Sequence, residues 1–333
     1  MSQSEPRRSS STLWNIFKII LAAVLVGYVL SRTDLTQLFA MRTRISLLWL
    51  MAYIVLYFIL TLLKAFQYYF LIGRSVGYPQ VLNIVVVQNA VSNFVATSAG
   101  VASYLALFRV EQEGKFSRAA LVFLLAKVGD LISIWLFMLV TSILVWQQVG
   151  AFHQLIFILL AGIGGAIFIF FLIIFLRQKF ISLLQALVDR IRLNRFGIVT
   201  KGMDIMQSLA EQEHGFVFRM MGIGILFSLI YMTVTMMWIY AGFQTFAFAI
   251  GVLPVVFVNV FMQLISYLPI QVFGGLGVNE TTMLYLYDSF HLPQAELAAV
   301  LIAVRLLFYV TNLLVLIYLP LHALVFNRLI KKG

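Results

Sequence analysis

Five ionisable side chains lie inside otherwise apolar stretches of this sequence, and they are the residues best placed to do chemistry. They are Lys64, Lys127, Asp130, Glu280 and Arg305. A charged side chain inside a membrane-spanning helix is expensive, so it is expected to pair with another group or to serve a function. The rest of the sequence has to explain how these five are positioned.

The charged residues suggest two pairs. Lys127 and Asp130 are three residues apart, so on a helix they share a face and can neutralise each other. Arg305 has no acidic residue on its own helix face, and Glu280 is its nearest candidate partner. Each pair has two interpretations, a structural pair or a binding site for a charged substrate. Lys64 is expected near the cytoplasmic surface, with its ammonium group extended to water.

A polar, glycine-rich interruption runs from Ser266 to Glu280. Pro269 cannot donate a hydrogen bond within a helix, and the three glycines between positions 274 and 277 hold a helix poorly. An apolar segment that enters at Leu253 should therefore stop here and restart, which places Glu280 in a first helical turn, where the macrodipole favours a carboxylate. Backbone broken at membrane depth is tolerated where it lines a cavity or is covered by protein.

The exposed N–H groups of such a helix start, with a nearby arginine, suit the phosphate of a lipid headgroup. The corresponding break in the first half of the chain is Thr97–Gly100, with Lys127 as its basic residue. The predicted substrate-binding residues are Gly274, Gly275, Gly277, Asn279, Glu280, Arg305, Lys127, Asp130, Ser98 and Gly100.

No catalytic residue, metal ligand or cofactor is predicted. The four histidines are scattered, and the sequence has no His-Glu-x-x-His, no nucleophile elbow and no phosphate-loop lysine. The glycine spacing is not that of a dinucleotide-binding motif.

Composition indicates the class of protein that holds these residues. Of the 333 residues, 62% are hydrophobic and 11% are charged, which a soluble domain could not present to water. The net charge of +11 comes from residues that flank apolar segments, so it indicates membrane topology and excludes a nucleic-acid surface. The absence of cysteine excludes disulfides and thiolate metal sites.

The predicted fold is an all-α polytopic membrane protein with about six full spans and two broken regions. Segments of spanning length contain about 20 apolar residues. The first is expected to be an uncleaved span, because no small-residue cleavage site follows it. The six spans are Leu13–Leu30, Ile45–Ile72, Ala119–Trp146, Phe152–Leu176, Met220–Phe243 and Leu297–Phe326.

The two broken regions, Val81–Phe108 and Leu253–Tyr287, could each cross the membrane or fold back as a re-entrant hairpin. Short cytoplasmic loops carry the excess of lysine and arginine. Two re-entrant hairpins place sixteen of these residues inside and three outside, whereas two crossings give thirteen and six. The count favours re-entrant hairpins, with both termini in the cytoplasm.

The same order of elements occurs twice, in a repeat at about 45–146 and another at about 220–326. In each, a broken region precedes a span with a basic residue, and the two repeats start from opposite sides. This pattern predicts an inverted repeat within one transmembrane domain over 1–333. The linker 177–219 is basic, and is either an amphipathic helix on the cytoplasmic leaflet or a charged loop.

Two segments carry a family resemblance, Asn93–Asp130 and Leu268–Tyr309, the latter with Gly-Gly-Leu-Gly-Val-Asn-Glu280 and Arg305-Leu-Leu-Phe-Tyr309. Over about Leu13–Phe326 the chain resembles the lysylphosphatidylglycerol synthase transmembrane region, a flippase-like family. The resemblance implies movement of a phospholipid between leaflets, while a separate soluble domain of full-length members makes the aminoacylated lipid. Only seven residues follow Phe326, so we expect no aminoacyltransferase activity.

The sequence thus predicts a lipid flippase or transporter of the cytoplasmic membrane, in which two hairpins frame a cavity for an anionic or zwitterionic headgroup. Two alternatives stay open, a membrane transferase with Glu280 or Asp130 as base and an accessory subunit of a lipid synthase. The predicted protein partners are a second copy of this chain or a lipid synthase.

Overall fold

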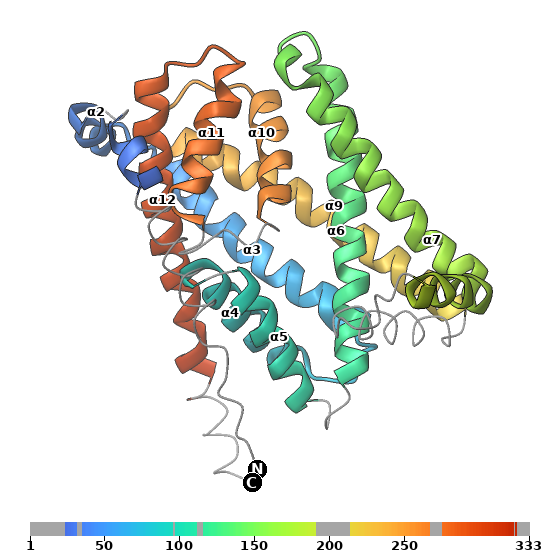
Figure 1. Ribbon diagram of the computed structural model, residues 1–333. Helices are drawn as coiled ribbons and strands as arrows, with labels where there is room; N and C mark the ends of the chain where they lie inside the picture. Colours follow the sequence, from blue (N-terminus) through green and yellow to red (C-terminus); the bar gives the residue numbers. More distant parts are fainter. Residues whose placement is uncertain are drawn as a thin grey trace, which may run out of the picture. The chain divides into compact units, whose positions relative to one another are not determined.

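The computed structural model describes residues 24–31, 35–95, 97–111, 116–190, 214–266, 275–322 and 324. Within these ranges the chain is helical, without a strand (Figure 1). The predicted span Leu13–Leu30 lies mostly outside these ranges, and residues 24–30 of it are helical. The elements are α2 (Leu35–Ala40), η1 (Met41–Arg44), α3 (Leu47–Leu71), α4 (Tyr78–Phe94), α5 (Thr97–Glu111), α6 (Phe116–Leu144), η2 (Gly150–Phe152), α7 (His153–Arg190), α9 (His214–Thr245), α10 (Val252–Ile265), α11 (Val278–Asp288) and α12 (Gln294–Leu316).

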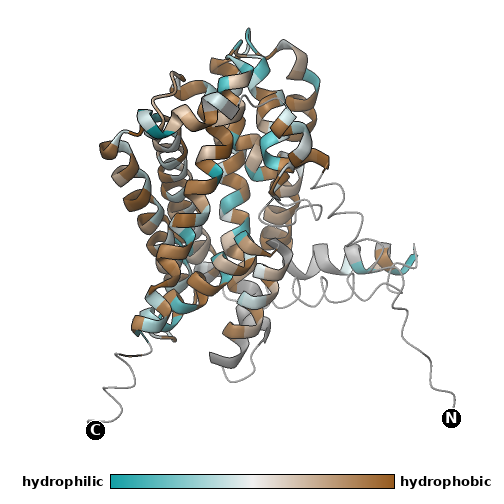
Figure 2. Ribbon diagram, turned by 90° about the vertical axis from the view of Figure 1, so that its left-hand side faces the viewer, coloured by the Kyte–Doolittle hydropathy of each residue, from teal (hydrophilic) through white to brown (hydrophobic). Residues whose placement is uncertain are grey.

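Five helical segments of the described chain are long and apolar enough to cross a membrane, and each matches one of the predicted spans. Figure 2 shows apolar residues along much of the helical ribbon, as expected for helices that cross a membrane. Phe157, Ile158 and Phe168 of α7, for example, are all more than 60% exposed. The five segments are Leu47–Leu71, Val122–Leu144, Gly150–Leu176, Val217–Thr245 and Gln294–His322.

Helix α7 has 38 residues and continues through the apolar span into the first part of the predicted basic linker. At 1.5 Å per residue it is about 57 Å long, well beyond the roughly 30 Å of a bilayer core. The helix is not straight, because Figures 1 and 2 show its last turns running across the direction of the apolar span. Of the rest of the linker, 191–213 lies outside the described residues and 214–219 belongs to the start of α9 (His214–Thr245).

The chain is interrupted within both predicted broken regions, although Thr97–Gly100 itself forms the first turn of α5 and the first break lies just before it. The first separates α4 from α5 after Val95, and the second separates α10 from α11. With 17, 15, 14 and 11 residues, the four helices are each shorter than a full span. Broken helices are therefore confirmed, while their re-entrant path through a membrane stays a prediction.

Contacts divide the chain into two compact units. Unit 1 contains 1–55, 86–103 and 238–333, and unit 2 contains 56–85 and 104–237. Each unit draws on both predicted repeats, so the units do not coincide with the repeats. The inverted repeat is untested by this division.

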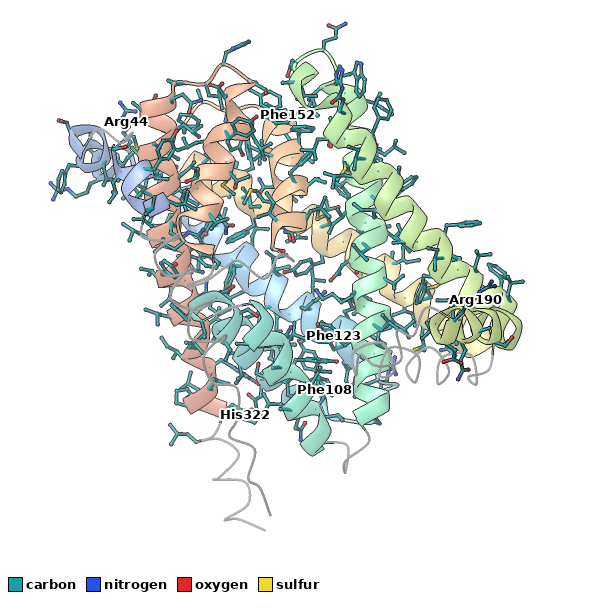
Figure 3. All side chains as sticks on the ribbon, in the orientation of Figure 1. Arg44, Phe108, Phe123, Phe152, Arg190 and His322 are labelled. Carbon is teal, nitrogen blue, oxygen red and sulfur yellow. The ribbon has the colours of Figure 1, made fainter. Side chains whose placement is uncertain are left out.

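In unit 1, α11 packs between α10 and α12, and Figure 1 shows α10 and α11 running side by side in opposite directions. The start of α12 is small and fully buried at Ala298 and Ala299, which allows close helix packing. Figure 3 labels Arg44, which forms an ion pair with Glu296 near the start of the segment Gln294–His322, and His322 at the end of that segment.

Unit 2 is built on a close helix crossing and an aromatic cluster. A Cβ atom on Gly129 of α6 would lie 2.8 Å from the carbonyl oxygen of Gly224 of α9, so the backbones meet where neither has a side chain. The rings of Tyr68, Tyr104, Phe108 and Phe123 pack together, and Figure 3 labels the two phenylalanines.

Candidate functional site

A cavity of about 240 Å³ lies within unit 1, and half of its lining residues are polar. Both broken regions contribute to it, the first through the end of α4 and the second through α10 and α11. Helix α12 and the end of α9 complete the walls. The lining residues are Tyr53, Ser92, Asn93, Trp238, Ile239, Asn259, Met262, Gln263, Ser266, Asn279, Glu280, Met283, Leu301, Val304, Arg305 and Phe308.

The predicted partners Glu280 and Arg305 form an ion pair on the wall of this cavity. Arg305 donates from Nε to Oε1 of Glu280 over 2.5 Å, and the two side chains are only 12% and 7% exposed. The arginine also lies against the rings of Phe308 and Tyr309, at 5.6 and 5.9 Å from their centroids. The pair is charge-assisted and almost removed from water.

Glu280 has a second role that the sequence also predicted, because it caps helix α11. Its Oε2 accepts a hydrogen bond of 2.7 Å from the backbone N–H of Gly277, three residues earlier. The carboxylate thus satisfies one of the free N–H groups at the helix start while its other oxygen holds Arg305. The structural interpretation of this residue thus has a geometric basis, while its contact with substrate stays a prediction.

The glycines of the break have a conformational reason to be glycine. Gly275 and Gly277 have φ angles of +79° and +81°, a region that other residues adopt at a cost. A Cβ on Gly275 would also lie 2.6 Å from the side chain of Asn279, which lines the cavity. Gly274 lies outside the described residues.

In the first broken region, Gly100 acts as a packing residue. A Cβ there would overlap the hydroxyl of Ser92 and lie 2.9 Å from the carbonyl oxygen of Gln88, so α4 and α5 approach closely at this point. Ser98 lies on α5, and its side chain is outside the described part of the structure. Asn93, beside the cavity, donates a hydrogen bond of 2.6 Å to Asn312 of α12.

Lys127 and Asp130 form the other predicted pair, within unit 2. Nζ of Lys127 lies 3.0 Å from Oδ2 of Asp130. A third charged residue joins them, because Lys64 donates to both oxygens of Asp130 at 3.1 Å. The expectation that Lys64 extends toward water is wrong, since its side chain is 11% exposed and bound to a carboxylate. A buried carboxylate that already exists in the core pairs with the ammonium group, so each compensates the charge of the other.

Two uncharged residues that were not predicted complete this cluster. Ser228 donates to Oδ1 of Asp130 over 2.8 Å, and Gln67 donates to the Ser228 hydroxyl over 2.8 Å and to the Gly224 carbonyl over 3.1 Å. Their signal in the sequence was weak, because neutral polar residues in spans often bond to neighbouring helices. The one indication in the sequence was that Gln67 follows Lys64 by three residues and so shares its helix face.

Among the described residues, no group of three or more His, Cys, Asp and Glu side chains is arranged to hold a metal ion. The arrangement in unit 1 can instead do two things. It can offer a guanidinium group to an anionic group that enters the cavity, and it can hold that group beside backbone and side-chain amides.

The fold and the cavity together define a polytopic, all-helical membrane protein with a buried charged pair at a broken helix. The chain belongs to the family described as lysylphosphatidylglycerol synthase TM region, which it matches over residues 15–315. This confirms the resemblance noted in the sequence. Comparison with curated proteins and with solved structures gave no match.

Proposed function

We propose that this protein moves a polar-headed lipid between the leaflets of the cytoplasmic membrane, with the headgroup passing through the unit 1 cavity. The observation that carries the proposal is the Glu280–Arg305 ion pair on the wall of a polar cavity that both broken regions line. Family membership supports a role connected with membrane lipid.

The size of the cavity matches a headgroup better than a whole lipid. Pockets for drug-sized molecules usually measure about 300–1,000 Å³, and this one is smaller, at about 240 Å³. A headgroup can enter it while the acyl chains stay in the bilayer. An anionic or zwitterionic lipid then finds a polar path without desolvating its phosphate in hydrocarbon.

Arg305 is proposed as the phosphate partner. Its guanidinium can bind a phosphate bidentately, and Glu280 competes for the same group when no lipid is present. Such an exchange keeps the buried guanidinium paired, and the displaced Glu280 carboxylate keeps its hydrogen bond from the Gly277 N–H. Asn279 and Asn259, which also line the cavity, offer hydrogen bonds to the rest of the headgroup.

We propose that the main role of the Lys64–Lys127–Asp130 cluster is structural. Its single carboxylate already accepts from Lys64, Lys127 and Ser228. Lys127 and Asp130 remain candidates for contact with substrate, as predicted from their place in the first repeat.

The test is a reconstitution in vesicles that carry a fluorescent phospholipid in both leaflets. An impermeant reductant bleaches only the outer leaflet of protein-free vesicles, and vesicles with the protein should lose the inner signal as well. Analysis of the lipid extract covers the alternative, because a transferase would give a new lipid product. Bleaching limited to the outer leaflet would contradict the proposal.

A further inference from the structure

A second pocket lies within unit 2, where α3 ends and α9 begins, and it is open and about 630 Å³ in volume. Its lining comes from the last turn of α3 and the residues just after it, and from the first turns of α9, close to where two candidate spans terminate. The pocket is therefore at the level of a membrane surface. The lining residues are Phe70, Gly73, Arg74, Gly215, Arg219, Met220 and Ile223.

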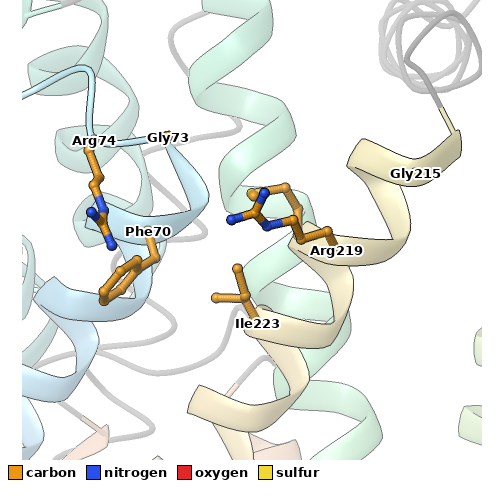
Figure 4. Close-up of a pocket in the computed structure, with 7 residues that line it drawn as sticks. Phe70, Gly73, Arg74, Gly215, Arg219 and Ile223 are labelled. Carbon is orange, nitrogen blue, oxygen red and sulfur yellow. The ribbon is translucent and has the colours of Figure 1, made fainter.

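Two arginines face this pocket from opposite walls, as Figure 4 shows, with their guanidinium groups directed into the space between the helices. Both are exposed, and none of the seven lining residues is acidic. No ion pair joins Arg74 or Arg219 to a carboxylate of the described chain. Two cations on one pocket, with no carboxylate partner among the described residues, attract an anion.

The conformation of Arg74 is unusual. It has a φ of +59°, directly after Gly73 at +71°, and such angles are uncommon for residues other than glycine. The backbone N–H groups of these two residues donate to the carbonyls of Phe70 and Tyr69, which closes the end of α3. The guanidinium carbon lies 4.8 Å from the centre of the Phe70 ring, so a cation–π contact holds it at the rim.

An apolar strip leads away from the arginines along the span. Leu62, Phe66 and Phe70 recur every four residues and so share one face of α3. Leu62 and Phe66 are 40% and 39% exposed, and Phe70 stacks on Phe227 of α9 at 5.6 Å. A ligand with a phosphate and a long apolar tail fits both halves of this surface.

From these contacts we propose that Arg74 and Arg219 form a binding site for the phosphate of an anionic phospholipid, whose acyl chain lies along Leu62 and Phe66. The site uses none of the cavity residues around Arg305. It goes beyond the proposed lipid movement and does not rest on it. Each arginine supplies a charge-assisted contact, and the Phe70 ring keeps one of them oriented.

Native mass spectrometry of the detergent-solubilised protein tests the site. The probes are dioleoylphosphatidylglycerol, dioleoylglycerol without a phosphate, and soluble glycerol 3-phosphate. The variant is Arg74→Gln with Arg219→Gln. The matched control, Arg42→Gln with Arg44→Gln, removes two exposed arginines outside the pocket.

The wild type should hold one more tightly bound copy of phosphatidylglycerol than the variant, whose affinity for that copy should fall about 30-fold. The control should bind like the wild type, and neither dioleoylglycerol nor glycerol 3-phosphate should occupy the site. If the double variant does not fold, Arg74→Gly keeps the backbone conformation and should weaken binding about fivefold.

Equal binding by variant and wild type would overturn the proposal, as would an equal loss in the control. Tight binding of glycerol 3-phosphate would show a site for soluble phosphates instead of a lipid site. The vesicle experiment has a separate readout, so either proposal can fail alone.

Discussion

Two arginine–glutamate pairs in unit 1 have the same chemistry in different surroundings. Arg305–Glu280 is 12% and 7% exposed, whereas Arg44–Glu296 is 49% and 31% exposed. A buried pair is sensitive to the loss of one partner, because the other charge is then left without compensation. Exposed pairs contribute little, since water and salt screen them.

We therefore expect Glu280→Gln to lower the free energy of unfolding by about 3–5 kcal/mol. The exposed counterpart, Arg44→Gln, should change it by less than about 1 kcal/mol. Thermal unfolding in detergent, followed by tryptophan fluorescence, gives the comparison. Equal effects of the two substitutions would show that burial does not control the strength of the Glu280 pair.

Asp130 should be the most sensitive residue of the unit 2 cluster. It accepts from Lys64, Lys127 and Ser228, so Asp130→Asn removes the carboxylate that two ammonium groups share. Lys64→Met leaves the Lys127–Asp130 pair intact and keeps an apolar side chain of similar length. Thermal unfolding should show that Asp130→Asn is more destabilising than Lys64→Met by about 2 kcal/mol or more. The reverse order would contradict the assignment of Asp130 as the residue that holds the cluster together.

At the scale of the helices, the close crossing of α6 and α9 depends on Gly129. Gly129→Ala would bring Cβ to 2.8 Å from the Gly224 carbonyl oxygen and 2.9 Å from the Ser228 hydroxyl, so the helices must separate. Overpacking of this kind costs about 1–3 kcal/mol. Gly222→Ala on α9 is the control, because nothing lies within 4 Å of a Cβ there. If both substitutions lowered the unfolding temperature equally, the close approach of α6 and α9 at Gly129 would be contradicted.

The helices themselves were largely predictable, and the reasons are local. Long apolar runs specify spans, and the proline and glycines around Gly275 specify a break. The spacing of Lys127 and Asp130 predicted their pair because three residues on a helix are neighbours. Lys64 was misplaced because its partner is 66 residues away, and the distance to the end of a span carries no information about that contact.

The same limit applies to the cavity. Ser92 and Asn93 line it together with Glu280, but their sequence gives no sign that the end of α4 packs near α12. Gly100 was assigned to substrate and is explained by the close approach of Ser92. Its contact with substrate stays a prediction.

For the whole molecule, the membrane topology remains to be tested. The distribution of lysine and arginine predicts that the loop after α11 faces away from the cytoplasm, because the second broken region turns back. The chain has no cysteine, so Ser289→Cys supplies a single reporter at the end of that helix. An impermeant thiol reagent should label it from outside intact cells. Labelling from the cytoplasmic side alone would require α10 and α11 to cross the membrane and would remove the inverted repeat.

We propose that the Arg305–Glu280 pair binds lipid and also holds α11 and α12 together. One set of variants in the vesicle assay separates these two roles. Arg305→Gln with Glu280→Gln removes both charges, which relieves the unpaired group and restores stability. Arg305→Lys keeps the charge without the bidentate geometry, and Arg44→Gln serves as the exposed control.

We expect the Arg305→Gln, Glu280→Gln protein to be stable and inserted but not to move the fluorescent lipid. Arg305→Lys should move it slowly, and Arg44→Gln should move it like the wild type. A double variant that is stable and moves lipid at the wild-type rate would show that the pair is structural, and would contradict the claim.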